Sequence, residues 1–124
     1  MRKLDRKLEH VRERGFGMMA VLDARDGAVI GYAGLQHLEG GKDVEIGYYL
    51  ARRAWGNGFA SELARELVRF GFEKLVLARI VAVVRPENDA SKAVLRKAGF
   101  DFVEHGYHYG ATVEFWAIYA TLRV

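Results

Sequence analysis

Two arginines and two closely spaced glycines stand immediately before an amphipathic segment in RRAWGNGFASELARELVRFGF, residues 52–72. After Gly58 the apolar residues recur every three or four positions, which predicts a helix beginning at this turn. The first turn of a helix presents unpaired backbone N–H groups and the positive end of the helix dipole, and both attract anions. Arg52 or Arg53 can add charge-assisted hydrogen bonds to phosphate. The pattern predicts a phosphate cradle; the alternative is a tight turn that only starts a helix.

Two common nucleotide-binding fingerprints do not fit this turn. A P-loop requires a lysine after its second glycine, and no lysine lies here. The dinucleotide fingerprint requires glycine or alanine three residues after Gly58, where Ser61 stands. It also requires an acidic residue at the end of a second strand, where residues 81–84 are apolar. The turn by itself leaves the kind of phosphate open.

The segments around the turn alternate between strand-like and helix-like patterns. Strands are expected at 18–22, 28–38, 44–50, 79–84, 100–107 and 111–122, and helices at 2–14, 59–73 and 90–98. The DARDG turn between the first two strands predicts an antiparallel hairpin. PEND supplies an N-cap for the last helix, and Gly99 supplies its C-cap. A single domain of α/β (α+β) class is expected over residues 1–124.

The composition argues against several classes of protein. With 51% hydrophobic and 28% charged residues, the chain is typical of a soluble globular domain. No apolar run approaches the ~20 residues that span a bilayer, so no membrane partner is expected. The absence of cysteine excludes disulfides and thiolate metal sites, and fits a cytoplasmic location. The net charge of +3 is spread among acidic residues, which argues against a nucleic-acid partner.

Several groups of residues, in a fixed order, match a known family. They are Arg53, Gly56 and Gly58, EIGYYL at 45–50, Trp55 to Ala60, and Asn88, Ser91, Lys97, Gly99 and Phe100. Together they resemble the GNAT superfamily of acetyl-CoA-dependent N-acetyltransferases over about residues 16–120. The closest likeness is to the ribosomal-protein N-terminal acetyltransferase (RimJ/RimL) type.

This resemblance implies a mixed, mostly antiparallel sheet with helices on both faces, and acetyl-CoA as co-substrate without a metal. The strand before the turn would diverge from the next strand at a bulge, with the pantetheine arm in the gap. The arm would pair with the backbone near Tyr49, Leu50 and Ala51, with Asn88 on its other side and Ser91 near the thioester sulfur. The residues implied to hold the pyrophosphate are Arg53, Trp55, Gly56, Asn57, Gly58, Phe59 and Ala60.

Acetyl transfer to an amine requires a neutral amine, a stabilised oxyanion and a protonated leaving thiolate. An α-amine of pKa ~7.8 loses its proton more readily than a lysine of pKa ~10.4, so a carboxylate acting through water suffices. Glu45 is the candidate base, or else a solvated carboxylate on the open face of a strand. A backbone N–H at Leu50 is the candidate oxyanion donor. Ser91 is a candidate acid, or else only a contact to the pantetheine or a helix-surface residue.

Two features depart from the family pattern. Leu95 stands where many relatives place a tyrosine, five residues before Phe100. The thiolate could then take its proton from Ser91 or water, or need little help. Relatives also begin with a strand and a helix ahead of the helix expected at 2–14, and this chain is expected to lack that first strand. It would be a truncated or remodelled form, or a second copy would pair with the open edge as a homodimer.

The expected function is direct acetyl transfer from acetyl-CoA to a primary amine, first of all a protein or peptide N-terminal amine. Two alternatives stay open: a small-molecule amine or antibiotic acetyltransferase, and a non-catalytic acyl-CoA-binding or oligomerising remnant of the fold. His105 and His108 lack the neighbours of a zinc site and are expected in a loop or at strand ends. Phe115 and Trp116 are expected in the core, and Trp55 beneath the turn.

Overall fold

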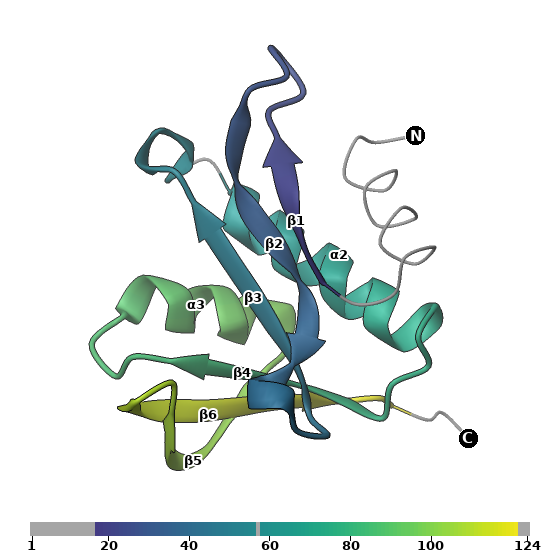
Figure 1. Ribbon diagram of the computed structural model, residues 1–124, viewed down its shortest axis with the longest axis vertical. Coiled ribbons are helices and arrows are strands. Elements are labelled where there is room, and N and C mark those ends of the chain that lie inside the picture. Colours follow the sequence, from purple (N-terminus) through teal and green to yellow (C-terminus); the bar gives the residue numbers. More distant parts are fainter. Residues whose placement is uncertain (1–16, 57, 122–124) are drawn as a thin grey trace.

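The computed structural model describes residues 17–56 and 58–121, which form one sheet and two helices. The elements are β1 (Gly17–Leu22), β2 (Val29–His37), η1 (Leu38–Gly40), β3 (Val44–Leu50), η2 (Arg52–Ala54), α2 (Phe59–Glu73), β4 (Arg79–Val84), α3 (Asp89–Ala98), β5 (Asp101–His108) and β6 (Ala111–Tyr119). All six expected strands and the two later helices are confirmed, with bounds within three residues of those expected (Figure 1). The helix expected at 2–14 lies outside the described residues.

The six strands form a sheet in the order β1-β2-β3-β4-β6-β5. Every neighbouring pair is antiparallel except β3 and β4, so the expected mixed, mostly antiparallel sheet is confirmed. β3 pairs with β2 over all seven of its residues, but it shares one bridge with β4, between Glu45 and Val81. Beyond that bridge the two strands diverge, as Figure 1 shows. No register shift interrupts the β2–β3 pairing, so the divergence occurs without the expected bulge.

Local signals explain where the elements begin and end. Asn88 caps α3, because its side-chain oxygen accepts the Ser91 N–H at 3.1 Å, and Gly99 ends the helix in a left-handed conformation (φ +101°). In the β1–β2 turn the buried Asp23 carboxylate accepts hydrogen bonds from the backbone and side chain of Arg25. These hydrogen bonds hold the pKa of Asp23 well below its usual range. Both predicted caps and the predicted hairpin turn are thus confirmed.

The main hydrophobic core lies between the sheet and the two described helices. α2 contributes Leu63, Leu67 and Phe70, which pack with Leu35 and Ile80 of the strands. The helices contact each other and share this cluster, so α2 and α3 cover the same face of the sheet. The family likeness also implied a helix on the opposite face. The remaining expected helix, at 2–14, lies outside the described residues, so that part stays a prediction.

A smaller cluster lies on the opposite face of the central strands. It contains Leu38, Val81, Phe115 and Ala117. Phe115 belongs to this cluster and Trp116 to the main core, which confirms the prediction that both are buried. None of the described helices combines the length and apolar character needed to cross a bilayer. Pairing of an open sheet edge with a second copy stays a prediction.

The contact between α2 and the sheet gives a first test. Gly71 is buried in α2, and a Cβ built on it would lie 2.7 Å from Ile80 Cδ1 and 3.3 Å from Leu35 Cδ1. Alanine favours a helix over glycine by ~1 kcal/mol, but overpacking a core costs about 1–3 kcal/mol. We expect Gly71→Ala to lower the free energy of unfolding by about 1 kcal/mol, measured by urea denaturation.

A double variant checks the cause of this loss. Ile80→Val removes the methyl group that the new Cβ would meet, at a cost of about 0.5–1.5 kcal/mol by itself. We therefore expect Gly71→Ala with Ile80→Val to be less destabilised than the sum of the single variants. A gain in stability from Gly71→Ala alone would contradict the packing described here.

Candidate active site

A cavity of about 530 Å³ occupies the opening between β3 and β4. Its walls come mainly from β3, β4, α3, β6 and the β5–β6 turn, with one residue each from β1 and β2. They consist of Met18, Gln36, Glu45, Ile46, Gly47, Tyr48, Tyr49, Ala82, Val83, Val84, Arg85, Asn88, Ser91, Leu95, His108, Tyr109, Ala111 and Val113. Four predicted site residues, Glu45, Tyr49, Asn88 and Ser91, therefore meet here. The volume lies in the range of small-molecule and cofactor sites.

The backbone of β3 presents polar groups to this opening. Along an antiparallel strand, the N–H and C=O groups of successive residues point alternately toward and away from the neighbour. Ala51 donates its N–H to the Ile30 carbonyl at 2.7 Å, so the backbone groups of Tyr48 and Leu50 point toward β4. The backbone of Leu50, whose N–H is the candidate oxyanion donor, thus faces the opening. The backbones of Tyr49 and Ala51 face β2 instead, which corrects the prediction, and Tyr48 is a position that the prediction missed.

The glycine turn between η2 and α2 has the backbone shape expected of an anion cradle. Gly56 (φ +77°) and Gly58 (φ +76°) both adopt left-handed conformations, which glycine takes without strain. A Cβ built on either would meet no atom within 4 Å, so the space beside both is open. Gly58 has no side chain to cap the first-turn N–H groups of α2, which starts with Phe59 and Ala60. Asn57 lies outside the described residues.

Trp55 lies at the surface, and the prediction that it packs beneath the turn is wrong. The residue is 62% exposed, and its indole N–H donates to the Leu50 carbonyl at 2.9 Å. The Arg52 guanidinium lies 5.4 Å from the centre of its ring. The indole binds a carbonyl that the divergence of β3 from β4 leaves without a strand partner. Trp55 therefore fixes the start of the turn from the outside.

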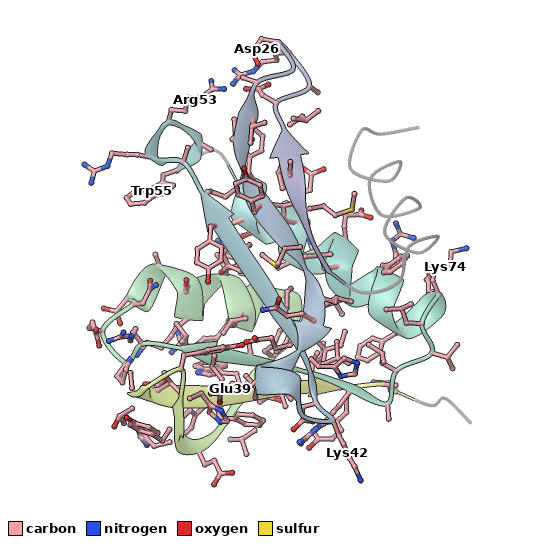
Figure 2. All side chains as sticks on the ribbon, viewed as in Figure 1. Asp26, Glu39, Lys42, Arg53, Trp55 and Lys74 are labelled. Carbon is pink, nitrogen blue, oxygen red and sulfur yellow. The ribbon has the colours of Figure 1, made fainter. Side chains whose placement is uncertain are left out.

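Arg53 points toward the β1–β2 turn, beside which Figure 2 shows it. Its guanidinium comes within 3.9 Å of the Asp23 carboxylate, with the Arg53 side chain about half exposed. The buried Asp23 carboxylate is bonded mainly by Arg25, and Arg53 contacts it only at this longer distance.

Glu45 is a buried carboxylate, 4% exposed. Gln36 Nε2 donates to its Oε1 at 3.2 Å, and the Tyr109 hydroxyl donates to the same oxygen. Among the described residues, none donates a hydrogen bond to Glu45 Oε2. The alternative of a solvated carboxylate on an open strand face is therefore wrong. Instead, one oxygen of Glu45 is held in place and the other stays available to a proton donor in the cavity.

The turn between β5 and β6 brings Tyr109 to Glu45. His108 Nδ1 lies 2.7 Å from Glu39 Oε1, and the Tyr109 N–H donates to Glu39 Oε2 at 3.2 Å. Tyr109 and Glu39 both adopt left-handed backbone conformations, with φ of +53° and +48°. These contacts join η1, on which Figure 2 labels Glu39, to the β5–β6 turn, and His108 and Tyr109 line the cavity. The contacts of Glu39 with His108 and Tyr109 thus hold the Tyr109 hydroxyl at the Glu45 carboxylate.

The two histidines that could have suggested a metal point to different neighbours. His105 is exposed in β5 with its ring 5.3 Å from that of Phe102, whereas His108 stacks near Phe115 at 5.9 Å. In residues 17–56 and 58–121 no three His, Asp or Glu side chains gather in a way that could hold a metal ion. His108 is the last residue of β5, which confirms the prediction of a strand end, but His105 lies inside β5, so the prediction of a loop or a strand end is wrong for His105.

The α3 wall of the cavity carries the remaining predicted residues. Asn88 uses its side-chain oxygen to cap the helix, so its amide nitrogen is the group left to bind a ligand. Leu95 is 2% exposed and belongs to the main core while also lining the cavity. Ser91 is half-buried and faces Tyr48 on β3, whose hydroxyl is buried without a hydrogen-bond partner among the described residues.

Sequence reasoning missed Gln36, Tyr48 and Tyr109. Gln36 lies directly opposite Glu45 in the β2–β3 register, so the exact hairpin register would have indicated it. Tyr109 is 64 residues from Glu45 and carries no local signal. Its role depends on the long-range contact with Glu39.

Comparisons with known proteins agree with this fold. The uncharacterized protein YkkB of Bacillus subtilis is 36% identical over 84% of this chain and 59% of its own length. The uncharacterized N-acetyltransferase p20 of Bacillus licheniformis is 46% identical over 58% of this chain and 41% of its own. The crystal structure of aminoglycoside acetyltransferase AAC(6')-Ib in complex with coenzyme A and kanamycin superposes with a TM-score of 0.71. It covers 90% of this chain and 70% of that one, at 20% identity.

Residues 2–101 match the acetyltransferase (GNAT) domain family, and the chain belongs to this family. The predicted superfamily and the fold class are thus confirmed. The chain spans about half the length of the two curated relatives named above.

The hydroxyl of Tyr109 gives a test of this site. Burial and the hydrogen bond to Glu45 raise the pKa of Tyr109 to about 12, against an ordinary value near 10. The ultraviolet absorbance of the wild type and of Tyr109→Phe is titrated against pH, and the difference between the two curves reports the ionisation of Tyr109. We expect this difference to give a pKa of about 12. In a Glu45→Gln background the same difference should titrate closer to 10. Circular dichroism defines the pH range in which the fold persists, and titration of Tyr109 near 10 in the wild type would contradict the contact.

The same contact predicts the pH dependence of stability. The folded chain holds this proton to a higher pH than the unfolded chain does. The contribution of Tyr109 is therefore fully present below about pH 10 and is lost as the pH rises through about 12.

Proposed function

We propose that this GNAT domain transfers the acetyl group of acetyl-CoA directly to a primary amine. The observation that carries the proposal is the opening between β3 and β4, which has the buried Glu45 in its wall and strand backbone groups along its side. An extended ligand can pair with such a strand edge as an additional strand would. The position of the glycine turn at the end of the same strand supports a ligand that is both extended and anionic.

The residues of the chain fit a coenzyme A molecule. The pyrophosphate would lie against the turn at Gly56 and Gly58, where the backbone is open and the dipole of α2 favours negative charge. Arg53 would neutralise part of that charge, and the remaining turn residues, Trp55, Asn57, Phe59 and Ala60, would shape the cradle. The arm would follow the β3 edge at Tyr48 and Leu50, with the Asn88 amide on the other side.

Glu45 would then act as the base. An amine enters with its proton in reach of Glu45 Oε2, directly or through a water molecule, while Gln36 and Tyr109 hold Oε1. The C–N bond forms as the C–S bond breaks, and the negative charge on the carbonyl oxygen is met by the backbone N–H of Leu50. Burial strengthens these interactions because the local dielectric is low.

The acceptor that we propose first is a protein or peptide N-terminal amine, as in the RimJ/RimL type. An α-amine needs less help to lose its proton than a lysine does. A single carboxylate with one free oxygen is a modest base and suits such an acceptor. A small-molecule amine is the alternative, since the aminoglycoside acetyltransferase named above has the same fold.

Coenzyme binding can be tested at the glycine turn. Gly56→Glu would place a strained, negatively charged residue where the pyrophosphate should lie. We expect isothermal calorimetry to show at least a 100-fold loss of acetyl-CoA affinity, the order of two lost charge-assisted hydrogen bonds.

Gly40→Glu is a matched control for that variant. Gly40 has the same backbone conformation (φ +74°) and equally open space, but it lies in η1, after β2. The Gly40→Glu variant should bind acetyl-CoA with the same affinity as the wild type. Equal affinity of Gly56→Glu and wild type would remove the coenzyme from this turn and the proposed function with it.

The role of Glu45 can be tested with Glu45→Gln, which keeps the shape of the side chain. We expect kcat to fall about 100-fold or more, with acetyl-CoA affinity unchanged, in an assay of free thiol release with a panel of amines. Glu104→Gln, on the exposed strand β5, serves as the control. Unchanged turnover of Glu45→Gln from about pH 6 to about pH 9 would exclude Glu45 as the base. Binding of acetyl-CoA by the wild type without thiol release for any amine would favour the non-catalytic alternative.

A further inference from the structure

The hydroxyl of Tyr48 is a buried side-chain polar atom without a hydrogen-bond partner among the described residues. Buried polar groups in native proteins are almost always paired, so an unpaired one requires an explanation. The ring of Tyr48 packs against the main core, and the residue lines the cavity between β3 and β4. The hydroxyl is therefore held rigidly at the cavity wall, where a ligand could supply the missing partner.

The position of Tyr48 on β3 determines the face of the sheet from which its side chain projects. Side chains alternate along a strand, so Glu45 and Tyr48 project from opposite faces of the sheet. Glu45 meets Tyr109 on one face, whereas Tyr48 lies on the face covered by α3 and has Ser91 nearby. The opening between β3 and β4 connects the two faces.

A transfer reaction in this opening separates two charges. The attacking amine gives up its proton on the Glu45 face. The carbonyl carbon gains a bond to nitrogen and loses its bond to sulfur, so the bonding electron pair departs on the sulfur. If the amine approaches from the Glu45 face, the sulfur lies toward the opposite face, which Tyr48 and Ser91 line.

We propose that the Tyr48 hydroxyl donates a hydrogen bond to the sulfur of the acyl carrier and stabilises the departing thiolate. The inference rests on the proposed function and adds a contact residue for the leaving group. Tyr48 keeps its proton throughout the step, and the thiolate is protonated afterwards from solvent.

The ionisation of Tyr48 agrees with a donor that does not transfer its proton. Burial raises the pKa of Tyr48, and the nearby side chain of Ser91 offsets part of the rise. The pKa of an ordinary thiol is about 8.5, below that of an ordinary phenol. The phenol therefore stays protonated under conditions in which the carrier is a thiolate.

The test uses coenzyme A itself and needs no acceptor. The chain contains no cysteine, so every thiolate in the sample belongs to coenzyme A. A hydrogen bond to the thiolate favours the charged form and lowers the pKa of the bound thiol. The difference in ultraviolet absorbance between the complex and its separate components, followed against pH, reports this pKa. We expect it to lie below that of free coenzyme A in the wild-type complex.

Tyr48→Phe keeps the ring and removes the hydroxyl. We expect the thiol–thiolate equilibrium of bound coenzyme A to move about tenfold toward the thiol, with coenzyme A affinity at neutral pH little changed. Stability to urea should be unchanged or higher, because an unpaired buried hydroxyl is lost. Tyr32→Phe, at a half-exposed tyrosine of β2 outside the cavity lining, is the control and should behave as the wild type.

The outcomes separate this inference from the proposed function. If the wild type does not bind coenzyme A, both are overturned. If it binds coenzyme A but leaves the thiol pKa at the free value, the inference alone is overturned, without any variant. The same holds if Tyr48→Phe and the wild type give equal thiol pKa values, or if Tyr48→Phe loses stability and binding together, which would indicate a structural role.

Discussion

The single bridge between β3 and β4 is the constraint on which the site depends. A parallel pair of strands normally satisfies the backbone groups of both along their shared length. Here the pairing ends at Glu45 and Val81, and the rest of β3 faces a cavity. The chain itself satisfies one of the exposed groups, since the Trp55 indole binds the Leu50 carbonyl. The remaining groups facing the opening have to be met by water or by a ligand, so the fold builds a binding edge inside the sheet.

The sequence indicated the elements whose cause is local. Asn88 and Gly99 bound α3 because a cap needs only residues within one turn, and Gly56 and Gly58 mark their turn because of their own backbone conformations. The destination of Trp55 was mispredicted because it depends on the divergence of two strands. Tyr109 was missed for a similar reason, since its contact with Glu45 joins residues 64 positions apart. Sequence patterns indicate interactions between residues that are close in the chain. The contacts of Trp55 with Leu50 and of Tyr109 with Glu45 depend instead on how the strands are arranged in the folded chain.

The burial of Glu45 illustrates how the fold holds a charged group ready for chemistry. A carboxylate in an apolar setting is costly unless hydrogen bonds compensate it. Both donors bind the same oxygen, so the compensation leaves Oε2 in the cavity. Glu39 and Tyr109 adopt left-handed conformations to complete this arrangement, and their mutual contacts hold them there. Val76 has a similar conformation between α2 and β4, so a positive φ alone does not mark the site.

The register between β2 and β3 matters as much as the opening itself. A slip by one residue would move every side chain of β3 to the other face, so Glu45 and Tyr48 would exchange faces. Gly31 of β2 opposes such a slip by letting β2 and β3 approach closely. A Cβ on Gly31 would lie 2.0 Å from the Tyr49 carbonyl oxygen. Any β2–β3 register that places another residue at this position meets a backbone clash. The two faces of the opening are thus kept distinct by strand packing remote from the reacting groups.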